Sequence, residues 1–273
     1  MKSLVYQYLG CLILLSALSA QAAETAPKST LSAYPEKVQL IGNRSRQQLL
    51  VSGTQDKQTV DLTRTVKFQT DQPAVIQVDE TGVIHPLANG VATVIVSDGA
   101  QSIKIPVEVK DFDKQTLIDF EHDVHPMFSR FNCNGGSCHG KQRGQGGFQL
   151  SMFAFDPEFD YAALTKESRG RRASPLAPDQ SLVLLKGAGK VPHGGGKKLP
   201  ANSSYYQLLE QWIAEGATRS VADTPKLVKI SAYPTEQIMQ PKTKQQMVVT
   251  AHYSDGSTRD VTDLAEYMSS ESV

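Results

Sequence analysis

The sequence predicts a multidomain chain: an all-β sandwich over residues 28–110, a mainly α domain over 111–220, and a truncated second sandwich over 226–273. Two observations support this fold class. Short β-branched runs separated by turn residues give way near residue 111 to apolar residues at helical spacing. The opening β-rich text then begins again near residue 226, and such internal repetition indicates repeated structural units.

Residues 1–22 have the composition of a signal peptide. Lys2 supplies the positive charge, residues 9–18 form an apolar core too short to span a bilayer, and Ala20-Gln21-Ala22 fits a cleavage site. We therefore expect export to a periplasm or to the cell surface, with no transmembrane span after cleavage. Lys and Arg number 28, as do Asp and Glu, so net charge favours no nucleic-acid partner.

The first β-rich region contains several short strand-like runs bounded by Gly, Asn, Asp and Pro. They cover residues 48–52, 74–78, 90–96 and 103–109, which predicts a β-sandwich. The region resembles bacterial Ig-like domains of group 2, on the strength of Asp61-Leu62-Thr63, residues 73–78 and residues 90–94.

Three segments of this region recur near the C-terminus. Residues 31–35 recur as 230–234, residues 47–51 as 245–249, and residues 61–63 as 260–262. The second copy ends level with the middle of the first, and half a sandwich would leave an apolar face uncovered. We therefore expect the chain to be the N-terminal fragment of a larger protein. The chain itself shows no catalytic motif, so any enzyme activity would lie in further C-terminal domains.

The middle region contains two helical patterns. The apolar residues Val124, Met127, Phe128 and Phe131 predict one helix that ends before Cys133. A second helix is predicted after a cap at Ser203 or Ser204 and before Gly216. Its apolar face consists of Tyr205, Leu208, Leu209, Trp212 and Ile213.

Cys133 and Cys138 are the only cysteines after the leader, and His139 follows the second directly. Two thiols followed by histidine are typical of covalent haem c attachment, in which the histidine becomes an axial iron ligand. The usual spacing has two residues between the cysteines, whereas four lie between them here. Two of those four are glycines, Gly135 and Gly136, which ease closure of the wider loop.

At this point the chain resembles the planctomycete-type cytochrome c domains of large exported proteins. The matching text covers residues 119–126, 133–141, 147–153, 155–161, 169–172, 192–196 and 212–217. The resemblance implies a mainly α cytochrome c-like domain between Ig-like domains, with further domains downstream as redox partners within the same polypeptide. It implies one haem c, bound covalently by Cys133 and Cys138 with His139 as the proximal ligand.

The sixth iron ligand is expected shortly before the last helix, where the sequence has His193 beside Pro192 and three glycines. We therefore predict coordination by His139 and His193. Met152 is the alternative sixth ligand, although its apolar neighbours favour a place in the core. His122 and His125 are expected to have surface or packing roles.

One cluster of basic residues stands out: Arg169, Arg171, Arg172, Lys186, Lys190, Lys197 and Lys198. Arginine pairs well with carboxylates, so Arg171 and Arg172 are candidates for contacts with the haem propionates. A redox partner protein or an acidic polysaccharide is a second interpretation of the cluster, and a solvated loop is the third.

Two other interpretations of the central residues remain open. Cys133 and Cys138 could form a structural disulfide, in which case the chain would be a surface adhesion or carbohydrate-binding protein. Alternatively, the two cysteines could bind a metal such as zinc together with His139 and His193. The spacing alone does not separate these from an exported, haem-c-binding electron-transfer module.

Overall fold

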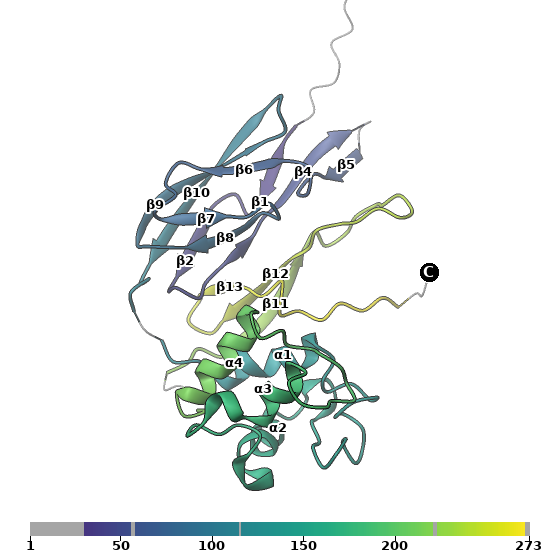
Figure 1. Cartoon of the computed structure of the whole chain (residues 1–273). Coiled ribbons are helices and arrows are strands. Elements are labelled where there is room, and N and C mark those ends of the chain that lie inside the picture. The colour runs from purple at the N-terminus through teal and green to yellow at the C-terminus, as the bar shows by residue number, and fades with distance from the viewer. Residues whose placement is uncertain (1–29, 56–57, 115, 221–222, 271–273) are drawn as a thin grey trace, which may run out of the picture.

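The computed structural model describes residues 30–55, 58–114, 116–220 and 223–270, so the predicted signal peptide at 1–22 lies outside the described part. Figure 1 shows a strand-rich body above and a region of short helices below, with a smaller sheet between them. No helix within the described ranges is both long and apolar enough to cross a membrane.

The upper body is a β-sandwich, as predicted. The sheets have the orders β1-β4-β5, β2-β10-β9-β6 and β3-β8-β7, and β2 pairs with β10 in parallel while the other pairs are antiparallel. The strands are β1 (Ser32–Tyr34), β2 (Val38–Ile41), β3 (Gln47–Gln48), β4 (Leu50–Gln55), β5 (Gln58–Asp61), β6 (Lys67–Thr70), β7 (Ile76–Val78), β8 (Val83–Pro86), β9 (Gly90–Ser97) and β10 (Ser102–Lys110).

Strict alternation of apolar residues explains the sandwich core. In β10, Ile105, Val107 and Val109 are each 2% exposed, because every second side chain points to the same face of a strand. Val94 and Val96 of the neighbouring β9 are fully buried in the same core. The predicted runs at 90–96 and 103–109 therefore form the two longest strands.

The middle region departs from the expected fold class. Its helical elements are η1 (Phe120–Val124), α1 (His125–Arg130), η2 (Met152–Ala154), α2 (Pro157–Thr165), η3 (Glu167–Gly170), η4 (Pro178–Gln180), α3 (Leu182–Gly187) and α4 (Ser204–Ala214). The prediction of a mainly α, cytochrome c-like domain is wrong: the longest helix has 11 residues, and the described chain has more strand than helix. Glycines interrupt the helices, and Gly144, Gly146 and Gly147 all have positive φ.

Both predicted helices form where the sequence places them. Asp119 accepts a hydrogen bond from the amide of His122 and so caps η1, which continues directly into α1. The Ser203 hydroxyl accepts a bond from the Tyr206 amide at the start of α4. The buried face of α4 is rotated slightly from the prediction, with Tyr206 buried and Tyr205 only half-buried.

The second strand-rich segment forms one antiparallel sheet, β11 (Leu227–Tyr233), β12 (Val248–Tyr253) and β13 (Thr258–Asp260). Its order matches that of β1-β4-β5, as the repeat predicts. The sheet lies between the sandwich and the helical region (Figure 1). Leu264, which follows β13, joins the hydrophobic core of the helical region.

Candidate cofactor-binding site

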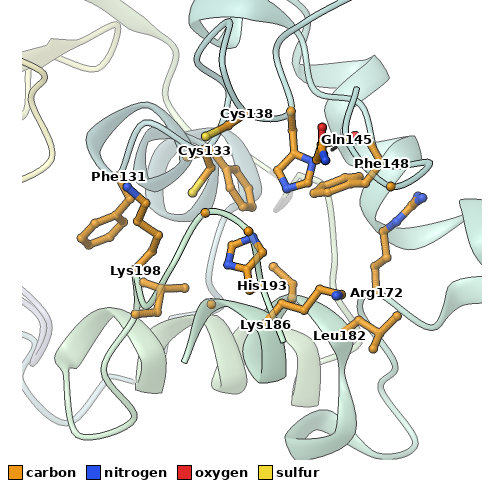
Figure 2. A pocket seen from close by; sticks show the side chains of 18 of the residues that line it. Phe131, Cys133, Cys138, Gln145, Phe148, Arg172, Leu182, Lys186, His193 and Lys198 are labelled. Carbon is orange, nitrogen blue, oxygen red and sulfur yellow. Dashed lines mark hydrogen bonds between the residues drawn. The ribbon is translucent and has the colours of Figure 1, made fainter. Parts of the chain in front are cut away.

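The helical region contains a cavity of about 450 Å³, a size typical of small-molecule and cofactor sites. Figure 2 shows Cys133 and Cys138 on one side of it, with His193 and Lys186 below and Phe148 opposite. Its wall is mainly apolar and includes Phe128, Phe131, Phe148, Val183, Leu199 and Leu209. The cavity therefore suits a largely apolar ligand that also binds a few polar groups of the wall.

A compact loop after α1 positions both cysteines. The Cys133 amide donates to the carbonyl of Phe128 over 2.7 Å, and the His139 amide donates to the carbonyl of Cys133 over 3.0 Å. A Cβ atom at Gly140 would lie 1.8 Å from the carbonyl oxygen of Asn134. Only glycine fits there, so the two cysteines are held on one small, tightly folded loop.

Both thiols line the cavity and neither is in a disulfide. Burial raises the pKa of the Cys133 thiol to about 11, although Lys198 opposes the shift. The thiol is therefore protonated at neutral pH, which does not favour a nucleophilic thiolate.

The ring of His139 is oriented by a backbone carbonyl. Its Nδ1 donates to the carbonyl of Phe148 over 3.0 Å, since a carbonyl can only accept. The proton is thereby fixed on Nδ1, and Nε2 keeps its lone pair. The ring also packs against the ring of Phe148, with centroids 4.6 Å apart. Burial lowers the pKa of His139, which favours the neutral, ligating form.

His193 has the same arrangement from the other side. Its Nδ1 donates to the carbonyl of Gly196 over 2.8 Å, so the lone pair of this ring also lies on Nε2. The rings of His139 and His193 have centroids 6.2 Å apart and planes inclined by only 9°. The two rings are therefore stacked. The structure thus brings together the two histidines that the sequence singles out.

The other predicted site residues have different positions. Arg172 lines the cavity but is 6% exposed, and its guanidinium donates to the carbonyls of Ala163 and Gly147. It also lies 4.6 Å above the ring of Phe148. Together with a bond to the Glu167 carboxylate, these contacts use three of its five N–H donors, so Arg172 supports the wall next to His139. The exposed Arg171 lines the cavity, and its Nε donates to the carbonyl of Ser168 over 3.3 Å.

Met152 does not line the cavity and is 46% exposed, so its expected place in the core is wrong. His125 is buried and its Nε2 lies 2.7 Å from the Asp160 carboxylate. That contact gives His125 the packing role expected of it. His122 is half-buried and packs near Tyr253, with ring centroids 5.2 Å apart.

Phe148 is the site residue that the sequence analysis missed. Its carbonyl orients His139 and its ring forms part of the cavity wall. The available signal was an aromatic residue directly after Gly146-Gly147 in an otherwise polar loop. A large apolar side chain in such a loop usually has a partner to pack against.

The zinc interpretation needs all four ligands within bonding distance of one point. Among the residues that the structure describes, no group of three or more His, Cys, Asp or Glu side chains is placed to hold a metal ion. The site consists instead of two histidines that share a cavity with two thiols.

Comparison with known proteins gives little similarity. No family model and no curated protein matches the chain. Domains 5–6 of the S-layer protein SbsC are 16% identical over 33% of this chain and 46% of that chain, with a TM-score of 0.27. A bacterial Ig-like domain containing GH10 xylanase from termite gut is 14% identical over 34% of this chain and 22% of that chain, with a TM-score of 0.24.

The chain therefore spans less than half the length of either structure that it matches. The expected membership of the planctomycete-type cytochrome c family is wrong, because no family model matches and the similar structures are an S-layer protein and an Ig-like-domain protein.

Proposed function

We propose that residues 111–220 bind one haem c and transfer electrons, with Cys133 and Cys138 as attachment points and His139 and His193 as axial ligands. One observation carries this proposal: two stacked imidazoles, each bound through Nδ1 to a backbone carbonyl, have ring centroids 6.2 Å apart in a cavity that both thiols line. The proposal rests on this geometry alone and does not require a cytochrome c fold.

The residues present fit the group. Cys133 and Cys138 would hold the group covalently, each by addition of its S–H across one vinyl double bond, which balances without an external oxidant. The loop around Gly140 keeps both sulfur atoms at the same wall, and the apolar side chains exclude water. Bound there, haem supplies one-electron redox chemistry. His139 and His193 would be its protein ligands, and ligation by two histidines would favour electron transfer over binding of oxygen.

Basic side chains surround the same cavity and indicate the charge of a partner. Arg171, Lys186 and Lys198 line it, and none of the three forms an ion pair with a carboxylate in the described chain. Two propionates would neutralise part of this charge. The remainder favours a redox partner with an acidic docking surface, located in the periplasm or at the cell surface if residues 1–22 direct export.

The decisive experiment is expression of the exported protein with a haem c maturation system, followed by haem staining of a denaturing gel. Wild type should give a stained band, and Cys133→Ala/Cys138→Ala should give none while accumulating to a similar level. A colourless wild-type band that shifts with reducing agent would contradict haem attachment. It would favour the disulfide-bonded adhesion or carbohydrate-binding alternative.

The axial ligand is tested by spectroscopy of the haem-loaded protein. His193→Ala should convert the low-spin ferric spectrum to high spin and permit binding of added imidazole, because it removes the ligand on one face. Met152→Ala is the matched control and should keep the wild-type spectrum, since Met152 lies outside the cavity. A low-spin spectrum in His193→Ala would show that another residue is the sixth ligand.

A further inference from the structure

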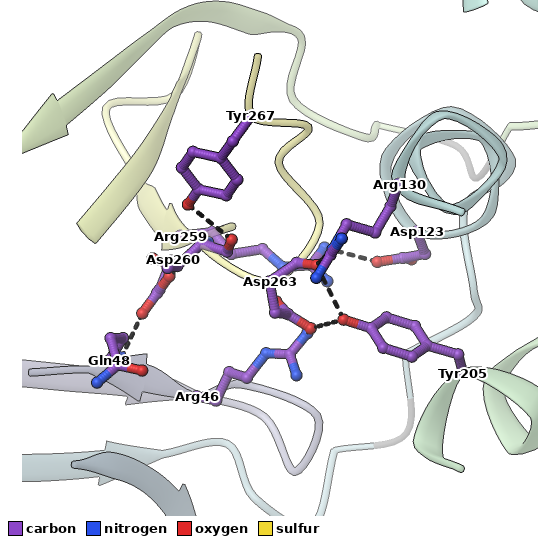
Figure 3. Close-up of polar contacts among 10 residues, drawn as sticks. Arg46, Gln48, Asp123, Arg130, Tyr205, Arg259, Asp260, Asp263 and Tyr267 are labelled. Carbon is purple, nitrogen blue, oxygen red and sulfur yellow. Dashed lines mark hydrogen bonds and ion pairs between the residues drawn. The ribbon is translucent and has the colours of Figure 1, made fainter. Parts of the chain in front are cut away.

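A short segment of the second strand-rich region reaches the helices beside the cavity. This segment, residues 259–263, begins in β13 and continues into the following turn; we call it the clamp segment. Figure 3 shows it between the sandwich residues Arg46 and Gln48 on one side and Asp123, Arg130 and Tyr205 on the other. Every contact described below joins parts of the chain that are more than 50 residues apart.

The first contacts hold the helix that leads to Cys133. The Arg259 guanidinium donates to the Asp123 carboxylate over 2.6 Å, and that carboxylate is about one-tenth exposed. Seven residues after Asp123, Nε of Arg130 donates to the backbone carbonyl of Asp263 over 2.9 Å. The clamp segment thus fixes η1 near its end and α1 at its last residue, three positions before Cys133.

The second contact holds the first turn of α4. The Tyr205 hydroxyl donates to both the carbonyl and the carboxylate of Asp263. Burial and the nearby Asp263 carboxylate raise the pKa of Tyr205, so the phenol stays protonated and remains a donor. The Tyr205 ring packs edge-on against Phe131, with centroids 5.1 Å apart. Phe131 lines the cavity, so one side chain separates Asp263 from the candidate site.

The clamp segment is itself anchored to the sandwich. Arg46 forms an ion pair with the Asp263 carboxylate, and the Gln48 amide donates to the Asp260 carboxylate. The ring of Tyr205 also lies 5.9 Å below the guanidinium of Arg46. Because both ends of these contacts lie on folded elements, the segment can resist movement of α1 relative to α4.

We propose that the clamp segment positions the cavity wall by holding α1 and α4 together through Arg259 and Asp263. In this way it fixes the position of Cys133. It also limits access to the space between His139 and His193. Arg259 and Asp263 are positioning residues, since neither lines the cavity. The effect on ligand access to bound haem rests on the proposed function. The effect on the position of the cysteine loop does not.

The mechanism follows from burial and pairing. Removing one partner of a partly buried, hydrogen-bonded charge pair leaves the other charge uncompensated, which favours opening of the contact. Local opening of this kind exposes amides near the contact without unfolding the rest of the protein. The amides of Cys133 and His139, both bonded within the loop, are the nearest reporters of the cavity wall.

The test is hydrogen exchange on the full chain, without haem, for wild type, Arg259→Gln and Asp263→Asn. Exchange in peptides covering residues 131–139 should become roughly tenfold faster in both variants, with β9 unchanged. Arg259→Lys should restore most of the protection. Arg64→Gln is the matched control: it removes the 2.7 Å contact with Gln246 between the two strand-rich regions but touches neither helix.

Unchanged exchange at 131–139 in Arg259→Gln and Asp263→Asn would overturn the proposal. Equal acceleration in Arg64→Gln, or acceleration that extends to β9, would also overturn it, because the effect would then be general destabilisation. In haem-loaded protein that also carries His193→Ala, and so has an iron position open to imidazole, the rate of imidazole binding should rise roughly tenfold when Arg259→Gln or Asp263→Asn is added. Faster amide exchange together with an unchanged rate of imidazole binding would show that the clamp segment does not limit access to the cavity. If wild type binds no haem, the proposed function is wrong. The hydrogen-exchange result still tests whether the clamp segment holds the cysteine loop in place.

Discussion

Leu31 in the first strand-rich repeat is 9% exposed, whereas the equivalent Ile230 in the second repeat is 60% exposed. Leu31 packs into the sandwich core, while the sheet that contains Ile230 has no second four-stranded sheet facing it within the described ranges. The two residues have similar side chains and the same place in the repeat. Their difference in burial therefore comes from the surrounding sheets and not from the local sequence.

The local hydrogen bonds, by contrast, are alike in the two repeats. The Thr63 hydroxyl accepts from the Val51 amide over 2.9 Å, and the Thr262 hydroxyl accepts from the Val249 amide over the same distance. Each threonine amide in turn donates to the aspartate two positions earlier. The aspartate–threonine motif thus forms the same turn in both repeats. It can do so because all of its hydrogen-bond partners lie close in the sequence or on the adjacent strand.

The two repeats also contact each other reciprocally. Asp260 accepts from the Gln48 amide, and Asp61 accepts from the Gln246 amide over 2.5 Å. The side chains that close the local turns therefore also join the repeats in a nearly two-fold arrangement. This pairing places the second repeat where its clamp segment can reach the helical region.

The largest difference is expected from truncation of the equivalent apolar residues. Leu31→Ala should lower the free energy of unfolding by about 2–5 kcal/mol, because it leaves a cavity in the sandwich core. Ile230→Ala should change it by less than about 0.5 kcal/mol, as for other exposed positions. Urea titration of the full chain, followed by circular dichroism, measures both. A large loss in Ile230→Ala would mean that this face is covered in solution.

A smaller difference is expected between the two aspartates. Asp260→Ala should cost about 1–3 kcal/mol, because it strands the Gln48 amide and removes a charged acceptor. Asp61→Ala should cost less, since Asp61 is only half-buried. The same urea titration compares them, and an equal or larger cost for Asp61→Ala would contradict the ranking.

The pH dependence of Asp260 gives an independent check. Burial raises the pKa of this carboxyl above its usual value. A raised folded pKa contributes stability that is present below the unfolded pKa of about 3.9 and is lost as the pH rises through the folded pKa. Wild type should therefore lose stability relative to Asp260→Asn as the pH rises from about 4. A constant difference between pH 3 and 7 would contradict the assignment.

The smallest effect concerns the stacked rings of Tyr34 and Tyr233, which join the two repeats with centroids 3.9 Å apart. A double-mutant cycle with Tyr34→Leu and Tyr233→Leu should give a coupling free energy of about 0.5–1.5 kcal/mol. Unfolding of the four proteins in urea supplies the cycle. A coupling near zero would show that the stacking contributes nothing beyond burial.

Only part of the candidate site could be predicted. The sequence singled out Cys133, Cys138, His139 and His193, because two cysteines followed by a histidine are typical of haem c attachment, and the structure places all four around one cavity. The role of Arg172 was not predictable, since nothing in a basic stretch of sequence distinguishes a buried arginine that packs against Phe148 from its exposed neighbours. The clamp contacts of Asp263 were equally hidden, because their partners lie far away in the sequence.

The sequence by itself determined the local structure: the caps at Asp119 and Ser203, the alternation in β9 and β10, and the repeated aspartate–threonine turns. Each depends on residues that are close along the chain or adjacent in one sheet. Only the tertiary structure decided that His139 and His193 share one cavity and that Ile230 is exposed while Leu31 is buried. Such properties depend on which distant segments pack together, and packing is set by the summed shape and burial of many side chains.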